Sequence, residues 1–215
     1  MSRRVVVVNY GVGNLLSVQR GLEACGAEVE ISSDPEVIAN AGRLLLPGVG
    51  AFESGMNELK SRGLVDAVIE FSSRGRPLLG ICLGMQMLLT ESEEFGLHAG
   101  LNLVPGRVIK IPDRDAAGSR VRKIPHIGWD ALRYPPDRDG WSDSLLENTR
   151  VGEYFYFVHS FMAVPENPED VLAECDYSGA RITAVVAHQN VMGCQFHPEK
   201  SSEAGLRLLN RFLEL

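Results

Sequence analysis

The first ninety residues alternate short apolar runs with segments of helical periodicity, and this alternation leaves few folds open to the chain. Val5–Val8, Leu44–Leu46 and Leu78–Leu79 lack the in-and-out alternation of a strand with one wet face. We expect them to be parallel strands that are covered on both faces. Further predicted elements are a strand at Val29–Ile31, a helix that begins at Asp34-Pro35-Glu36, and helices that bury Leu15, Val18 and Leu22 or Leu64, Val68 and Phe71. The pattern predicts an α/β fold with a mostly parallel sheet flanked by helices.

The second half of the chain changes in character from about Pro105. Pro112–Lys123 is charged and contains glycine, and Pro135–Gly140 is rich in turn residues. Additional strands, antiparallel in part, are predicted in this half at Tyr154–Val158, Val171–Ala173, Ile182–Ala187 and Val191–Phe196. A final helix should open at Ser202 and turn Leu206, Leu209 and Leu213 inward. Because no repeat or linker interrupts the sequence, we expect one domain over residues 1–215.

Composition excludes several classes of protein. With 45% hydrophobic residues and a formal net charge of −7, the 215-residue chain is typical of globular proteins and a poor candidate for nucleic-acid binding. Its four cysteines form no CxxC pair, which argues against a zinc site and a disulfide framework. Only four valines precede Asn9, too short a run for a signal peptide or a membrane span. We expect a cytoplasmic protein without membrane contact.

The segment Gly80-Ile81-Cys82-Leu83-Gly84 directly follows a predicted buried strand and has the form of a nucleophile elbow with cysteine in place of serine. Its glycines would permit a strained strand-to-helix turn that lifts the nucleophile off the sheet. The backbone N–H of Leu83 would then be one oxyanion donor, and the start of the next helix would favour the thiolate of Cys82. A lone cysteine is more often a small buried residue, but two flanking glycines at a strand end favour the nucleophile.

A cysteine nucleophile needs a base, and the base needs a group that orients it. His197-Pro198-Glu199 offers both, because residues two apart in an extended segment project to the same side and Pro198 stiffens the spacing. The competing interpretation is a surface turn after the preceding strand. Position favours the catalytic interpretation, since the pair follows a second strand end.

Other short motifs are less specific. The Pro47-Gly48-Val49-Gly50 loop can bring peptide N–H groups toward an anion, so Val49 and Gly50 are candidates for a second oxyanion donor. Gly11-Val12-Gly13 does not complete a dinucleotide motif, because the third glycine position is Leu16. We therefore expect no cofactor and no metal. Of the remaining histidines, His98 and His188 are expected at the surface, whereas His126 and His159 should be packed or shape a pocket.

These residues resemble the class I (triad) glutamine amidotransferases, and among them the glutaminase subunits of imidazole glycerol phosphate synthases. The resemblance runs nearly end to end. It is carried by Asn9–Asn14, Pro47–Gly50, Gly80–Gln86, His126–Trp129, Tyr156–Ser160 and Gln195–Lys200. It implies a flavodoxin-like fold and hydrolysis of glutamine through a cysteinyl thioester, with release of glutamate and ammonia.

The resemblance also assigns roles to individual residues. Cys82 would be the nucleophile, His197 the general base and then acid, and Glu199 its orienting partner. The N–H of Leu83 and a peptide of Val49-Gly50 would hold the oxyanion. Gln86, His159 and Ser160 would hold the amino-acid part of glutamine.

The family's glutaminase forms a heterodimer with a β/α-barrel cyclase subunit, to which it passes ammonia for histidine biosynthesis. Such a partner should cap the elbow side of the sheet, near Asn9–Asn14, His126–Asp130 and Lys200. The chain departs from the family pattern at Asn9, where aspartate is usual, and at Asp130, where asparagine is usual. Both departures leave open a paralogous glutaminase that serves a cyclase-like partner in sugar amination. A non-catalytic regulatory subunit of the same fold and a cysteine peptidase also stay open as interpretations of the sequence.

Overall fold

A seven-stranded sheet forms the centre of the computed structural model, which describes residues 3–114, 118–119 and 121–215. Its order is β11-β12-β13-β4-β3-β1-β2, and the five strands from β13 to β2 are parallel. Val5–Val8 of β1 and every residue of β3 and β4 are buried, which confirms the prediction of strands covered on both faces. The bounds are β1 Arg4–Val8, β2 Glu28–Ser32, β3 Leu44–Leu46, β4 Leu78–Ile81, β11 Val171–Tyr177, β12 Ala180–His188 and β13 Val191–Cys194. As predicted, β11 and β12 add antiparallel pairing in the C-terminal half.

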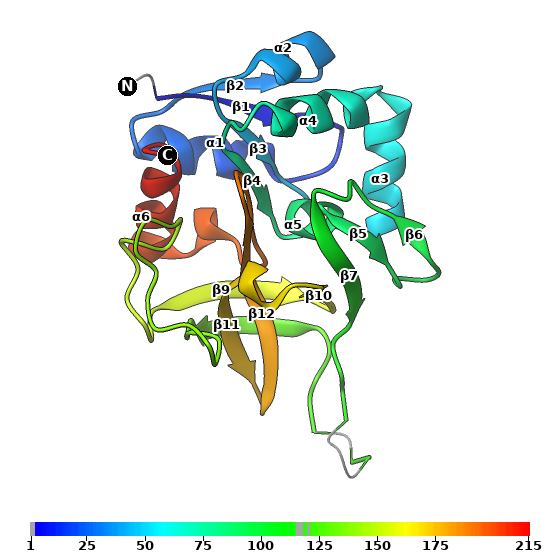
Figure 1. The fold of residues 1–215 in the computed structure, drawn as a ribbon, viewed down its shortest axis with the longest axis vertical. Helices are drawn as coiled ribbons and strands as arrows, with labels where there is room; N and C mark the ends of the chain where they lie inside the picture. The colour runs from blue at the N-terminus through cyan, green and yellow to red at the C-terminus, as the bar shows by residue number, and fades with distance from the viewer. Residues whose placement is uncertain (1–2, 115–117, 120) are drawn as a thin grey trace.

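Helices cover both faces of this sheet (Figure 1). One face packs against α1 (Leu15–Ala24) and α6 (Ser202–Phe212), and the other packs against α2 (Pro35–Asn40), α3 (Phe52–Ser61) and α4 (Leu64–Ser73). The start of α2 is as predicted, because the Asp34 side chain accepts a hydrogen bond from the Glu36 N–H at 2.9 Å. The two ends of the chain lie close together, since Arg3 contacts Asn210 of α6.

Two smaller sheets lie beside the central one. The first has the order β10-β7-β5-β6, and the second pairs β8 with β9. Their bounds are β5 Leu89–Ser92, β6 His98–Ala99, β7 Val104–Lys110, β8 His126–Ala131, β9 Tyr154–His159 and β10 Phe161–Pro165. Three short helices complete the described elements: α5 Leu83–Met87, η1 Pro168–Asp170 and η2 Pro198–Lys200.

The structure corrects two details predicted from the sequence. The last strand ends at Cys194 and not at Phe196, because the chain leaves the sheet to form the turn at His197. In α6 the fully buried positions include Leu208 and Phe212, whereas Leu206 is half-buried. Part of the Pro112–Lys123 segment, namely residues 115–117 and 120, lies outside the described residues.

The carboxyl ends of β1, β3, β4 and β13 meet at one edge of the sheet, because these strands are parallel and adjacent. The segments that leave this edge are the ones in which candidate site residues were expected.

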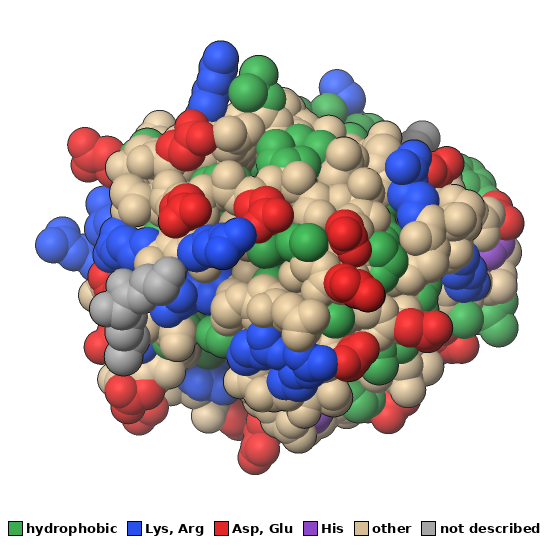
Figure 2. All heavy atoms as spheres, turned by 90° about the horizontal axis from the view of Figure 1, so that it is seen from above, with side chains coloured by type: hydrophobic (Ala, Val, Ile, Leu, Met, Phe, Trp, Pro, Cys, Tyr) green, Lys and Arg blue, Asp and Glu red, His purple; other side chains and the backbone are tan. Residues whose placement is uncertain are grey.

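The face drawn in Figure 2 carries acidic and basic side chains interspersed with apolar ones. Within the described part of the chain, no helix is both long and apolar enough to cross a membrane.

Candidate active site

Cys82 lies at the turn between β4 and α5, with a backbone φ of 54° and ψ of −110°. A positive φ is rare for a residue other than glycine, so the surrounding structure must hold this conformation against strain. The Cys82 N–H donates to the carbonyl of Cys194 in the neighbouring strand at 2.8 Å. The side chain is 7% exposed, and it lines a pocket. This geometry matches the strained elbow that the sequence predicts.

The two glycines of the elbow have a different purpose from the one expected. Neither Gly80 nor Gly84 has a positive φ; Cys82 itself adopts the strained conformation. The glycines are needed for space, because a Cβ on Gly84 would lie 1.9 Å from the Leu46 carbonyl oxygen. A Cβ on Gly80 would lie 2.7 Å from the Met85 backbone nitrogen. The absence of side chains thus lets α5 pack directly on β3 and β4.

We predict that Gly84→Ala destabilises the protein by about 3 kcal/mol or more, at the upper end of the usual cost of overpacking, because the clash is with backbone that cannot move aside. Urea denaturation measures this difference. Gly42→Ala is the matched control, since a Cβ on Gly42 would have nothing within 4 Å. Equal denaturation midpoints for the two variants would contradict the steric explanation.

The pocket at the elbow has a volume of about 370 Å³, within the usual range for small-molecule sites. Eight of the nine predicted site residues line it: Val49, Gly50, Cys82, Leu83, Gln86, His159, Ser160 and His197. The ninth, Glu199, contacts His197 from behind, with Nδ1 and Oε1 2.8 Å apart. The structure thus brings together residues from the turn after β4, from α5, from the end of β9 and from the loops after β3 and β13.

The contact between His197 and Glu199 is present, but its predicted cause was wrong. Pro198–Lys200 forms a 3-10 turn and not an extended segment, and this turn folds the Glu199 carboxylate back under the ring. Both side chains are at most 3% exposed. Ser201 supports the turn by donating a hydrogen bond to the His197 carbonyl at 2.6 Å.

The charge state of His197 follows from its surroundings. Burial lowers its pKa, but the Cys82 sulfur and the Glu199 carboxylate favour the charged ring more strongly and raise the pKa to about 9. The second ring nitrogen, Nε2, is buried and has no hydrogen bond of normal geometry among the described residues. It is therefore available to exchange a proton with a molecule in the pocket.

The predicted oxyanion donor at Leu83 is occupied. Its N–H donates to the carbonyl oxygen of Gly48 at 3.3 Å, a long hydrogen bond that a stronger acceptor could replace. The Pro47–Gly50 loop is held in place by Tyr10, whose buried hydroxyl donates to the Pro47 carbonyl at 2.6 Å. Because a Cβ on Gly48 would lie 2.5 Å from that hydroxyl, only glycine fits the position.

Two of the three side chains expected to hold a substrate, Gln86 and His159, contact the same backbone carbonyl. The Phe161 oxygen contacts His159 Nδ1 at 2.8 Å and accepts from the Gln86 amide nitrogen at 3.0 Å. Burial lowers the pKa of His159 to about 3, so this ring is neutral and Nδ1 carries its hydrogen. His126 packs behind it, with His126 Nδ1 and His159 Nε2 3.0 Å apart.

Two polar residues at the site were given no role from the sequence. Glu94 lines the pocket and is 9% exposed, with Oε2 accepting the Phe52 N–H at 2.7 Å. Gln195 is fully buried, and its amide nitrogen donates to the Cys82 sulfur at 3.7 Å. Gln195 directly precedes Phe196-His197, which was a signal in the sequence. Glu94 carried no such signal, since it approaches the pocket only through the turn after β5.

The remaining histidines differ in part from expectation. His98 and His188 are half-buried and not fully exposed, and His188 Nδ1 lies 3.0 Å from an oxygen of Asp170. His126 is packed, as expected, between the rings of Phe157 and Tyr177. None of these three rings lines the pocket at the elbow.

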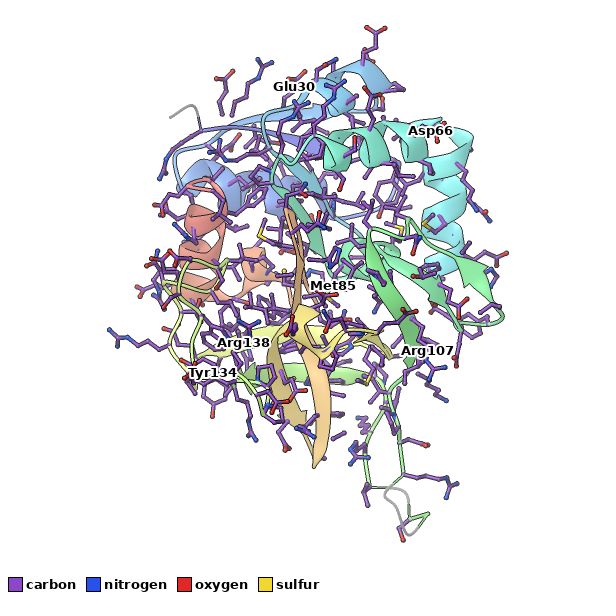
Figure 3. The ribbon with its side chains drawn as sticks, in the orientation of Figure 1. Glu30, Asp66, Met85, Arg107, Tyr134 and Arg138 are labelled. Carbon is purple, nitrogen blue, oxygen red and sulfur yellow. The ribbon has the colours of Figure 1, made fainter. Side chains whose placement is uncertain are left out.

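A second, larger hollow of about 1010 Å³ lies on another part of the surface, where Figure 3 labels Arg138 and Tyr134 nearby. Arg138, Asp170 and Arg181 are among the residues that line it, and none of the lining residues is a cysteine, histidine, serine or threonine. It therefore offers no thiol, imidazole or hydroxyl nucleophile of the Ser/Thr type. Among the described residues, no group of three or more histidine, cysteine or acidic side chains could hold a metal ion.

Comparison with known proteins agrees with this geometry. The family model "Glutamine amidotransferase class-I" matches residues 6–215. The chain is 48% identical over 211 residues to "Imidazole glycerol phosphate synthase subunit HisH 1" of Legionella pneumophila, covering 98% of this chain and 99% of the relative. It is 40% identical over 215 residues to the HisH subunit of Geobacter sulfurreducens, with 99% of each chain covered.

Solved structures show the same fold at low sequence identity. A crystal structure of a glutamine amidotransferase matches with a TM-score of 0.70 and 18% identity, covering 98% of this chain and 99% of that one. The structure of PurLQS from Thermotoga maritima matches with a TM-score of 0.69 and 20% identity, covering 100% and 99%. The family model over residues 6–215 and the relatives at 40–48% identity show that the chain belongs to the class I glutamine amidotransferase family.

Proposed function

We propose that this protein is the glutaminase subunit of an imidazole glycerol phosphate synthase, and that it supplies ammonia from glutamine to a cyclase subunit in histidine biosynthesis. The observation that carries the proposal is the strained Cys82 in one pocket with His197, whose ring is oriented by Glu199. The similarity to HisH subunits over nearly the whole chain supports the choice of synthase.

The chemistry follows from the charges in the pocket. The Cys82 thiolate attacks the side-chain amide carbon of glutamine, and the His197 imidazolium gives its proton to the leaving nitrogen as the C–N bond breaks. Ammonia leaves and a glutamyl thioester remains on the sulfur. His197, now neutral, takes a proton from water while the water oxygen attacks the thioester carbon. The C–S bond then breaks, which releases glutamate and restores the thiolate and the imidazolium.

The oxyanion of each tetrahedral intermediate needs hydrogen-bond donors, and in the resting pocket the Leu83 N–H is bonded to another acceptor. We assign the Leu83 N–H as one donor, after it is released from the Gly48 carbonyl. A peptide N–H of Val49 or Gly50, both of which line the pocket, is the second. The glutaminase would therefore be weak until the Pro47–Gly50 loop rearranges.

The amino-acid part of glutamine needs acceptors for its ammonium group. Glu94 offers a buried carboxylate at the pocket wall, and we assign it as the principal partner of that ammonium. The Gln86 amide nitrogen is occupied by protein acceptors, so Gln86 contributes its oxygen. His159 and Ser160, at the end of β9, complete the wall of the pocket.

We further infer that a β/α-barrel cyclase subunit covers the carboxyl edge of the sheet. Ile127 and Trp129 of β8 are exposed large apolar side chains, and Val49 at the pocket mouth is a third. Lys200 is exposed at the same strand end as His197. His126, which was grouped with this face in the sequence analysis, is buried, so only its neighbours in β8 can contact a partner. We place the complex in the cytoplasm and treat residues 1–215 as one amidotransferase domain.

Coupled turnover tests this proposal. The protein is mixed with the histidine-pathway cyclase of its own organism and that enzyme's ribonucleotide substrate, with glutamine or with ammonium chloride. We expect imidazole glycerol phosphate to form from either nitrogen source. Formation from ammonia but not from glutamine would show that the chain serves another synthase, such as one that aminates sugars.

A further inference from the structure

A chain of hydrogen bonds connects the backbone of β10 to the sulfur of Cys82. The Gln86 amide nitrogen donates to the Phe161 carbonyl at 3.0 Å and to the Gln195 side-chain oxygen at 3.0 Å. The Gln195 amide nitrogen then donates to Cys82 Sγ at 3.7 Å. The chain lies behind the nucleophile, where Gln195 is fully buried and Gln86 is 5% exposed.

The Phe161 carbonyl fixes the donor and the acceptor of every hydrogen bond in this series. A backbone carbonyl can only accept, so the Gln86 group that faces Phe161 must be its NH₂. The second hydrogen of that NH₂ points at Gln195, so the Gln195 group that accepts it must be the side-chain oxygen. The Gln195 NH₂ is therefore the group that faces the sulfur. A reversed Gln195 would place two donors together and leave an acceptor against a thiolate.

The backbone holds Gln195 in this place independently of its side chain. The Gln195 backbone N–H donates to the Ala184 carbonyl of β12 at 2.8 Å. The Cys82 backbone N–H donates to the carbonyl of Cys194, which directly precedes Gln195. The elbow and β13, which ends just before Gln195, are thus bonded to each other next to the sulfur. The side-chain bond needs no movement to form.

We propose that Gln195 is a catalytic residue whose amide N–H stabilises the Cys82 thiolate, and that Gln86 is the residue that orients it. This assignment rests on the proposed glutaminase function. An amide donor differs from His197 in that it neither titrates nor transfers a proton, so it supports the sulfur in every step of the cycle. In the steps that break a bond to sulfur, the same N–H stabilises the thiolate as leaving group.

The test measures the reactivity of the thiol without glutamine or a partner, so it stays separate from the test of the glutaminase function. Iodoacetamide modification of Cys82 is followed against pH by mass spectrometry. The other three thiols give little background, because burial raises the pKa of Cys25, Cys175 and Cys194. Gln195→Met removes the donor at similar volume, and we expect the midpoint of the modification curve to rise by about one pH unit.

Gln195→Glu is the second variant, because it keeps the acceptor for Gln86 and replaces only the group that faces the sulfur. A carboxyl is a stronger acid than a thiol, so the shared proton stays on sulfur and modification at pH 7 should slow about tenfold or more. Gln189→Glu adds the same charge at an exposed turn and should leave the curve unchanged.

Wild-type midpoints in the folded Gln195 variants would overturn the proposal. One further measurement needs no substitution at Gln195. In the wild-type protein, the NMR signals of the Gln195 side-chain amide should shift as the Cys82 thiol titrates, and this shift should be missing in Cys82→Ala. Gln195 amide signals whose chemical shifts stay constant as the Cys82 thiol titrates would also overturn the proposal.

Discussion

Cys82→Ala should reduce glutamine hydrolysis by about 10⁴-fold or more, the largest loss that we expect from any single substitution in this protein. No other described thiol can replace the sulfur at the elbow, since Cys82 is the one cysteine among the described residues that lines the pocket. Glutamate release, measured with the cyclase and its ribonucleotide present, reports this loss.

The same variant should keep ammonia-dependent synthesis close to the wild-type rate. Added ammonia reaches the cyclase without a thioester, and alanine at position 82 leaves the elbow without a clash. Cys25→Ala is the matched control and should retain both activities, because this half-buried thiol packs at the edge of the core, donates to the Leu206 carbonyl at 3.3 Å and does not line the pocket. Substantial glutamine turnover by Cys82→Ala would refute the thioester mechanism.

The parts of the fold that could be predicted from the sequence are those in which local pattern and final environment agree. Val5–Val8 and Leu44–Leu46 are apolar throughout because helices cover both sides of the sheet, so their composition alone indicates their place. The cap at Asp34 is equally local. The helix α3 escaped prediction, since it begins at Phe52 without a capping side chain on the residue before it.

The site shows the same division. Cys82 and His197 could be predicted because strand ends and flanking residues are visible in the sequence. The reason for the glycines could not, since the clash at Gly84 is with Leu46, a residue 38 positions away in the chain. Glu94 depends on a contact of the same kind, with Phe52, 42 positions away in the chain. The contact of Glu199 with His197 was predicted from an extended segment and arises from a turn, because both geometries bring residues two apart together.

His197→Ala should lower kcat/KM for glutamine by about 10³-fold, because the leaving ammonia and the attacking water both lose their proton-transfer partner. Glu199→Gln should cost less, about 10- to 100-fold, since the ring remains but is held by a neutral group. Glutaminase kinetics with the partner present rank the two variants. An equal loss in both would mean that Glu199 does more than orient the ring.

The pH dependence separates orientation from charge. Formation of the thioester needs the imidazolium, and the pKa of His197 is raised to about 9, so wild-type activity should fall as pH rises through about 9. The Glu199 carboxylate supports this raised pKa, whereas a neutral amide cannot. In Glu199→Gln the alkaline fall should therefore move to lower pH, and imidazole resonances in NMR should show the same movement. An alkaline fall that stays at the wild-type pH would show that Cys82 alone sets the charge of His197, and that Glu199 acts only through the position of the ring.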